Sequence, residues 1–231
     1  MAIEDLCGPK VDQPVLDAIE AEGFTPLGWF DPEPADGVPE LESGCPVASA
    51  VLVGNAGPAM FARFAAERDV ARDRLDDWCR DVLGRLAQRL GAGVHFPFDA
   101  PPLPFPTWAR RAGAGHASPL GLNIHPRSGL WHAYRALLTF PRRLPLPRPD
   151  LGAHPCRTCA GRPCLAACPV GAFTNPGYDV AACARHIASR DGTDCMAGGC
   201  LARHACPVGP AYAYGPRQAG FHMRAFQRSV T

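Results

Sequence analysis

Eight cysteines crowd into the last third of this sequence, and their types and spacing could support redox or metal chemistry. The chain has 231 residues and 11 cysteines, of which only Cys7, Cys45 and Cys79 precede residue 155. Thiolates are soft, anionic ligands that suit iron–sulfur clusters and zinc. Because such a group of thiols in a reducing compartment indicates metal ligation rather than disulfides, we expect a metal centre here.

The cysteines form an internal repeat. CLAACPVG, residues 164–171, is echoed by CLARHACPVG, residues 200–209. Two cysteine-proline pairs at this spacing are typical of two-cluster ferredoxins, in which the cysteine before proline ligates the other [4Fe–4S] cluster. We therefore predict two ligand sets. The first set is Cys156, Cys159, Cys164 and Cys206, and the second set is Cys168, Cys183, Cys195 and Cys200.

Two zinc sites of four cysteines each are the alternative interpretation. Cys156-x2-Cys159 fits a zinc knuckle, but zinc patterns do not call for a repeated Cys-Pro. The four-residue gap between Cys159 and Cys164 departs from the two residues of bacterial ferredoxins. The iron–sulfur interpretation is favoured and the zinc interpretation stays open. Cys79 reads as a buried core residue, and Cys7 and Cys45 as spare loop thiols.

The elements before these cysteines predict an α+β layer fold with an antiparallel sheet. The apolar patterns predict helices over 14–22, 58–69, 72–90 and 107–112, and strands over 24–30, 47–54, 94–98, 120–126 and 129–140. Gly23 is expected to end the first helix in the left-handed conformation. The last two strands are expected to be joined by a turn at 126–129. The four prolines of 141–150 predict an extended connector between two domains.

Composition excludes several classes of protein. The chain carries 23 basic and 22 acidic residues, so it lacks the positive field typical of nucleic-acid binding. Its start shows no secretory signal, and its apolar runs are too short to cross a bilayer. We expect a cytoplasmic protein that does not bind a membrane.

Four motifs follow one another along the chain: Asp99-Ala-Pro-Pro-Leu, Ala112-Gly-Ala-Gly115, Gly129-Leu-Trp131 and the cysteine module. This series resembles epoxyqueuosine reductase, a cobalamin-dependent enzyme with two [4Fe–4S] clusters that is related to the reductive dehalogenases. The resemblance implies that Asp99 is a proton-donating acid; as a plain loop aspartate before two prolines, it would need no such role. Gly115-His-Ala-Ser-Pro replaces the family's Gly-Trp-x-Gly-Lys pattern, which argues against a tRNA substrate.

A second group of motifs consists of Gly28-Trp-Phe, Gly57-Pro-Ala-Met-Phe and the run from Ile124 to Arg135. These motifs are similar to those of the CblC-type cobalamin-processing chaperones. Both families have a nitroreductase-like fold. The resemblances therefore imply a nitroreductase-like α/β sandwich that binds cobalamin over residues 1–145, followed by a small ferredoxin-like module with two [4Fe–4S] clusters over 146–231.

The same resemblances imply where cobalamin would bind. Glycines would let the backbone approach the corrin ring, and buried aromatic side chains would exclude water. The expected lining residues are Gly121, Leu122, Asn123, Ile124, Gly129, Trp131, Tyr134 and Arg135. Ordinary roles stay open for several of them: Trp131 could pack in a core, and Arg135 could face solvent on an edge strand. His116 and His125 are weaker candidates as cobalt ligands.

The preferred hypothesis is therefore an enzyme, a cobalamin-linked iron–sulfur reductase. Electrons from an external flavodoxin, ferredoxin or reductase would pass through two clusters to cobalamin. They would reduce or dealkylate cobalamin itself, or reduce a small-molecule substrate. The alternative is a ferredoxin-type electron-transfer protein that binds no cobalamin, and a third hypothesis is a zinc-stapled interaction protein.

Overall fold

The computed structural model describes residues 15–72, 74–147, 149–174 and 177–230. The chain divides into two compact units. The first comprises the described part of Met1–Ala114 together with Ala133–Leu151, and the second comprises Gly115–His132 and the described part of Gly152–Thr231. The sequence placed residues 115–132 in the first domain. They belong to the second unit because Leu120, Ile124 and Leu130 share a buried cluster with Cys164 and Cys206.

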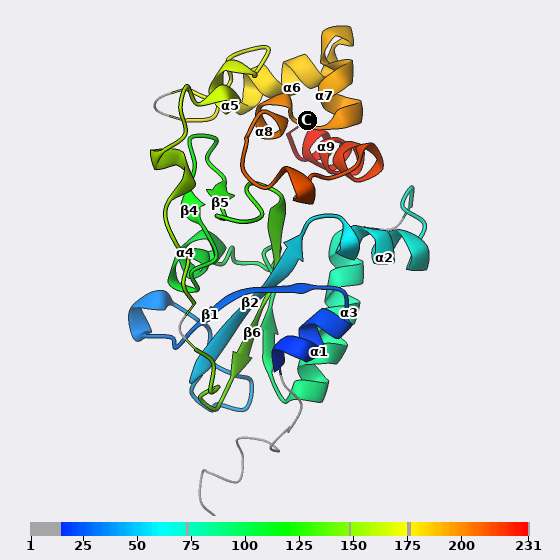
Figure 1. Ribbon diagram of the computed structural model, residues 1–231. Helices are drawn as coiled ribbons and strands as arrows, with labels where there is room; N and C mark the ends of the chain where they lie inside the picture. The colour runs from blue at the N-terminus through cyan, green and yellow to red at the C-terminus, as the bar shows by residue number, and fades with distance from the viewer. Residues whose placement is uncertain (1–14, 73, 148, 175–176, 231) are drawn as a thin grey trace, which may run out of the picture. The chain divides into compact units, whose positions relative to one another are not determined.

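The first unit is built on a four-stranded antiparallel sheet in the order β1-β2-β6-β3 (Figure 1). The strands are β1 (Thr25–Phe30), β2 (Ser49–Ala56), β3 (Gly93–His95) and β6 (His132–Phe140). The helices are α1 (Val15–Ala21), α2 (Ala59–Glu67), α3 (Leu75–Leu90) and α4 (Phe105–Arg111), with a short 3-10 helix, η2 (Pro34–Asp36). The predicted α+β class is confirmed.

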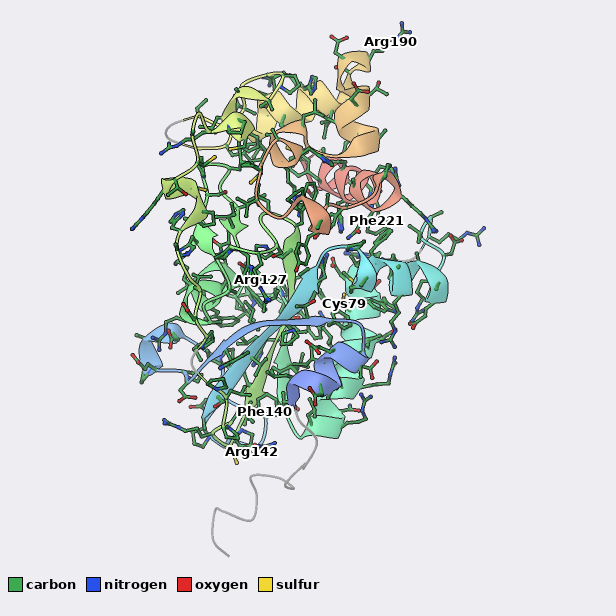
Figure 2. The ribbon with its side chains drawn as sticks, in the orientation of Figure 1. Cys79, Arg127, Phe140, Arg142, Arg190 and Phe221 are labelled. Carbon is green, nitrogen blue, oxygen red and sulfur yellow. The ribbon has the colours of Figure 1, made fainter. Side chains whose placement is uncertain are left out.

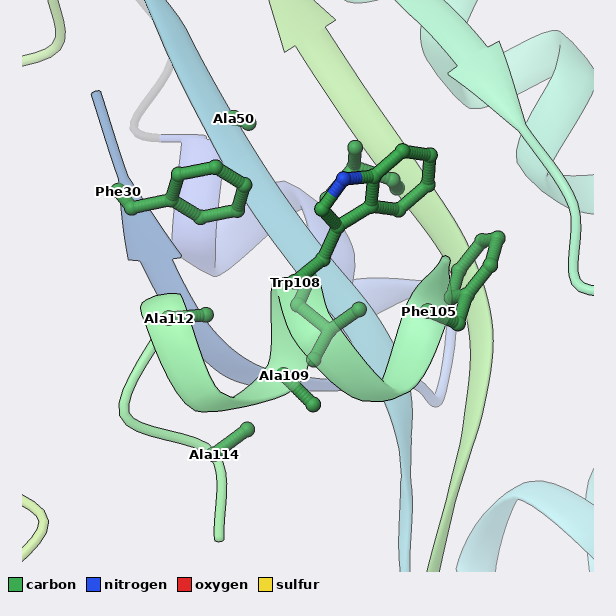
Figure 3. Close-up of a cluster of buried hydrophobic side chains, with 9 residues drawn as sticks. Phe30, Ala50, Phe105, Trp108, Ala109, Ala112 and Ala114 are labelled. Atoms are coloured by element: carbon green, nitrogen blue, oxygen red, sulfur yellow. The ribbon is translucent and has the colours of Figure 1, made fainter. Parts of the chain in front are cut away.

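Helices cover both faces of this sheet. Seven consecutive residues of β2 are buried, as expected of a central strand covered on both sides. On one face α4 inserts Phe105 and Trp108 against Phe30 and Leu52 (Figure 3), and the Trp108 indole donates to the Asp36 carbonyl at 2.8 Å. Helices α1 and α3 lie together on the other face (Figure 1).

The predicted helix ends follow local sequence signals. Gly23 has φ of 76°, the left-handed conformation expected of it after α1. Helix α3 begins at Leu75 and its pattern of apolar residues is buried. Cys79 is fully buried within that pattern, and burial raises the pKa of its thiol to about 12. It is the core residue that the sequence predicted.

Cys45 does not match its prediction. It is buried and disulfide-bonded rather than a spare loop thiol. Cys7 lies outside the described residues. The proline-rich connector has no regular secondary structure over its described residues, and it packs on the first unit through buried Leu144 and a hydrogen bond from Trp29 Nε1 to the Pro147 carbonyl, 2.7 Å.

The turn predicted at 126–129 is present, with His125 and Gly129 forming an antiparallel bridge, but the strands on either side of it pair in different sheets. In the second unit β4 (His116–Ala117) pairs with β5 (Asn123–Ile124). The strand predicted over 129–140 corresponds to β6, which pairs within the four-stranded sheet of the first unit. The apolar pattern located both strands, but their partners depend on which core each one can cover.

The rest of the second unit is made of short helices (Figure 1). They are η3 (Pro155–Arg157), α5 (Pro163–Ala166), α6 (Val180–Ala188), η4 (Arg190–Gly192), α7 (Thr193–Gly198), α8 (Leu201–His204), η5 (Pro210–Tyr212) and α9 (Pro216–Val230). Helix α9 packs on α6 and α7, and α5 packs on α8. Among the described residues, none of the helices has the length and apolar character needed to cross a membrane.

Candidate functional site

The eight late cysteines are all free thiols in the second unit. Cys164, Cys195 and Cys206 are buried, and the others are half-buried. Each lies on or within a few residues of a helix that is three to nine residues long. Cys164 and Cys206 are part of a buried cluster with Leu120, Ile124 and Leu130, so the thiols share the unit's apolar interior.

The thiols of the first set lie close enough to interact electrostatically. Burial raises the pKa of Cys156, and the negative charges of Cys206, Cys164 and Cys159 raise it further. The pKa of Cys164 is raised in the same way, first by burial and then by Cys206. Cys206 thus lies beside Cys164 although the whole second ligand set separates them in sequence.

The thiols of the second set are neighbours of one another. Burial raises the pKa of Cys195, and Cys183 and Cys168 add to the shift. The pKa of Cys200 is raised by burial and then by Cys195 and Cys183. Cys168, which follows Cys164 by one helical turn, therefore faces the second set rather than the first. The packing of α5 on α8 brings the two copies of the repeat together.

Backbone N–H groups point at several of these sulfurs. Ala172 N donates to Cys168 Sγ at 3.3 Å. The amide of Leu201 donates to Cys195, and those of Ala202 and Arg203 donate to Cys200. Such donors stabilise negative charge on sulfur and oppose the effect of burial on the pKa. This is the environment that a thiolate ligand of a metal cluster needs.

Among the described residues, no group of three or more His, Cys, Asp or Glu side chains is arranged to hold a metal ion. The donor chemistry nevertheless fits [4Fe–4S] clusters: two sets of four thiols, largely removed from water, with N–H donors to sulfur.

Tyr178 is a contact of the second set that sequence reasoning missed. Its hydroxyl donates to the Cys183 sulfur, and its pKa is raised by burial and then by this hydrogen bond. The ring stacks on Phe173, with centroids 4.9 Å apart. The only sequence signal is an aromatic residue five positions before a ligand cysteine, which is too common to be specific.

Arg203 is a second residue that the sequence did not single out. Its guanidinium lies 4.6 Å from the centroid of Trp131 and 4.5 Å from that of Tyr214. It also donates from Nε to the Leu130 carbonyl at 3.0 Å. Trp131 is therefore buried by protein groups of the second unit, in the core-packing role that the sequence left open.

The residues expected to line cobalamin fall into both units. Gly121 and Leu122 are exposed at the β4–β5 turn, where Asn123 is half-buried. Ile124 is buried against the cysteine cluster, and Gly129 lies against the Val208 backbone, where a Cβ would collide with the carbonyl oxygen. The structure thus gathers Gly121–Ile124, Gly129 and Trp131 within the second unit.

Tyr134 and Arg135 belong to the first unit, on β6. Tyr134 packs against the cluster around α4, and Arg135 Nε donates to Asn55 Oδ1 at 3.1 Å. Arg135 is thus half-buried and hydrogen-bonded rather than a free edge-strand arginine.

Asp99 lies in the loop after β3 and is hydrogen-bonded through both carboxylate oxygens. Oδ2 accepts from Phe96 N at 2.7 Å, and Oδ1 accepts from Arg80 Nη2 at 2.9 Å. These contacts fold the loop that contains the cis Ala100–Pro101 bond. The carboxylate has a structural role in the first unit beside the catalytic role that the resemblance implies.

His125 is a poor cobalt ligand. Its Nδ1 accepts from Arg127 N and Ser128 N, at 3.1 and 3.3 Å, so the proton of the neutral ring sits on Nε2 and no lone pair remains for a metal. Burial lowers the pKa of His125, which favours this neutral form. His116 stacks on His154 and is directed by Nε2 at the Gly152 carbonyl.

No protein-family model matches the sequence, and no curated protein matches it. Three solved structures, all described as epoxyqueuosine reductase, are similar in fold. One in complex with an epoxyqueuosine-modified tRNA-Tyr stem loop has a TM-score of 0.51 at 16% identity over 89% of this chain, and the selenomethionine-labelled protein gives the same values. The Bacillus subtilis protein, with its catalytic aspartate loop swung out of the active site, has a TM-score of 0.47 at 17% identity over 85% of this chain.

The chain spans between 65% and 69% of the length of these structures. At such low identity the likeness is one of fold alone. This protein therefore has a fold similar to part of epoxyqueuosine reductase, with a cysteine-rich carboxyl-terminal region whose thiols form two neighbouring groups of four.

Proposed function

We propose that this protein transfers electrons through two [4Fe–4S] clusters, one held by each cysteine set. The observation that supports this most directly is the segregation of eight free thiols into two groups of four, with Cys206 and Cys168 each beside the other repeat's cysteines. Zinc staples would need no such exchange between repeats. When bound, [4Fe–4S] clusters accept and release single electrons at low potential.

The chain's own residues would set the properties of these centres. Burial of Cys164, Cys195 and Cys206 keeps water from the sulfurs. The amides that donate to Cys168, Cys195 and Cys200 hold negative charge at the second set, which raises the affinity for electrons there.

We further propose that the electrons reduce cobalamin, either as the substrate to be reduced or dealkylated or as the cofactor for reduction of a small molecule. The support is the sequence resemblance and the fold. Within the second unit, Gly121, Leu122 and Asn123 are at least partly exposed and are the residues of that unit that would contact the ring. Ile124, Gly129 and Trp131 are covered by protein and would support them from within.

The cluster proposal is tested by removing one ligand at a time. Anaerobically reconstituted protein should contain about eight irons. Cys206→Ser should lower that to about four and leave the paramagnetic resonance signal of the second set. Cys195→Ser should also lower the iron content to about four, but it should leave the paramagnetic resonance signal of the first set. Zinc in place of iron, or loss of both signals from either substitution in a folded protein, would contradict the proposal.

The cobalamin proposal is tested by titrating cobalamin into the reduced, reconstituted protein. The expected result is a change in the cobalamin absorption spectrum as cobalt is bound and reduced. An unaltered spectrum, with both clusters present, would favour the alternative of a ferredoxin-type protein that binds no cobalamin.

A further inference from the structure

The exposed apolar side chains of the protein are unevenly distributed. Among the described residues, the large hydrophobic side chains that are exposed all belong to the second unit. They are Leu122, Val170, Tyr178, Val180 and Leu201, which are 36–47% exposed. Leu122 lies at the β4–β5 turn, and the other four flank ligands of the second cysteine set.

Each of these four side chains lies close in sequence to a cysteine of the second set. Val170 follows Cys168 by two residues, and Leu201 directly follows Cys200. Val180 precedes Cys183 by three residues on α6, so the two lie on the same face of the helix. Tyr178 contacts the second set directly, through its hydrogen bond to Cys183 and its electrostatic interactions with Cys200 and Cys168. We name Val170, Tyr178, Val180 and Leu201 the apolar rim.

Positive charge accompanies the apolar rim. The residues of the second unit include nine arginines and no lysine, against three aspartates and no glutamate. The ion pairs of the described residues all lie in the first unit. Arg185 and Arg190 are exposed on α6 and η4, and Figure 2 shows Arg190 extending away from these helices. The rim therefore lies in a unit whose arginines are not neutralised by its own acids.

We propose that the apolar rim is the docking surface for an acidic electron-carrier protein, and that electrons enter this chain at the second cysteine set. The inference rests on the proposed iron–sulfur function. In each transfer the reduced carrier, a flavin or iron–sulfur protein, loses one electron and the cluster of the second set gains one. Val170, Val180 and Leu201 lie within three residues of three of the four ligands, so a carrier bound to the apolar rim would lie beside that centre.

The chemistry of the surface favours a protein over a nucleic acid. A transient protein interface has an apolar centre and a charged rim, and the charge steers the encounter. Here aliphatic side chains lie near the ligands in sequence, and Arg185 and Arg190 are exposed on α6 and the adjoining η4. RNA would instead be held by arginines with bases stacked on exposed aromatic rings. Three of the four side chains of the apolar rim are aliphatic, and its one aromatic ring, Tyr178, already stacks on Phe173.

The test measures binding of a flavodoxin, a small acidic carrier, to the reconstituted full-length protein by anaerobic calorimetry. Wild-type protein should bind, and its affinity should fall as salt is raised. Val180→Asp should weaken binding about tenfold, because it places a charge like the carrier's own at the apolar centre. The double variant Arg185→Glu with Arg190→Glu should weaken it by a similar factor and reduce its salt dependence.

Two control variants make the same kinds of change, an added carboxylate and a reversed arginine charge, away from the apolar rim. Ala66→Asp adds a carboxylate at an exposed position of α2, and Arg85→Glu reverses an exposed charge on α3, both in the first unit. Both should bind flavodoxin as the wild type does. Equal loss in the controls, or wild-type affinity in the rim variants, would overturn the proposal. The proposal would also be overturned if the wild-type protein bound a tRNA stem loop but not flavodoxin, and if the double arginine variant lost that RNA binding.

Iron content and paramagnetic resonance of every variant separate this inference from the proposed function. A wild-type protein that takes up no clusters would overturn both. Cluster-loaded protein that is reduced by dithionite yet does not bind flavodoxin would overturn only the docking surface.

Discussion

Arg80 Nη2 lies 2.9 Å from Asp99 Oδ1, and the same guanidinium lies over the rings of Phe96 and Phe98 at 4.6 and 4.9 Å. Asp99 is also bound by the Phe96 amide. The residue implied as a proton donor is therefore anchored within its own loop. Any test of its chemistry must separate loss of the carboxyl group from loss of this anchor.

Asp99→Asn and Arg80→Met separate the two roles. We expect Asp99→Asn to stop turnover of a small-molecule substrate and to leave cobalt reduction intact, because only the substrate needs a proton. Arg80→Met removes the ion pair but keeps the carboxyl group, so turnover should persist. The exposed pair itself should contribute only about 0.5 kcal/mol to stability. Equal loss of turnover in both variants would show that Asp99 acts only as an anchor.

Tyr178→Phe removes a hydrogen bond to the Cys183 sulfur and keeps the ring that stacks on Phe173. A donor to sulfur stabilises the more negative, reduced state of a cluster. We expect the midpoint potential of the second set's cluster to fall by roughly 40 mV, equivalent to about 1 kcal/mol. A redox titration followed by paramagnetic resonance measures it. Tyr212→Phe, at a tyrosine packed near Trp131, is the control and should leave the potential unchanged.

Gly129 and Gly121 form a natural pair for testing close backbone approach. Both have positive φ, 57° and 72°. A Cβ at Gly129 would collide with the Val208 carbonyl oxygen, whereas Gly121 has open space around it. Gly121→Ala should cost about 1 kcal/mol from its backbone conformation alone. Gly129→Ala should cost several kcal/mol more and reduce cluster loading, as urea unfolding and iron content would show. Equal costs would contradict the contact.

His132 should make stability depend on pH. It is buried, its Nδ1–H donates to the Gly129 carbonyl, and burial lowers its pKa from 6.5 to about 4. In the unfolded chain His132 therefore becomes protonated as the pH falls below 6.5, whereas in the folded chain it stays neutral until about pH 4. The stabilisation is complete above pH 6.5 and is lost as the pH falls toward 4, by about 3 kcal/mol in total.

His132→Gln should flatten this part of the stability profile, measured by urea unfolding between pH 7 and 5. The matched substitution His204→Gln changes an exposed histidine of the same unit and should keep the wild-type slope. A slope that is the same in both variants would assign the pH dependence to other groups.

Local sequence signals accounted for much of the first unit. Gly23 ended α1 as predicted, and the apolar spacing of α3 buried Trp78, Cys79 and Leu83. These features depend on neighbours within a few residues, so a single sequence contains them. Strand pairing depends instead on distant parts of the chain. Strand β5 pairs with β4 rather than β6 because the core that a strand covers decides its partner.

The sequence by itself determined the late cysteines, their repeat and the expectation of two sets, because spacing along a short chain limits which thiols can meet. Only the tertiary structure decided what surrounds them. Three such features are the contact of Tyr178 with Cys183, the contact of Arg203 with Trp131, and the inclusion of residues 115–132 in the second unit. Side-chain packing and backbone approach set such contacts, and no periodicity in the sequence records them.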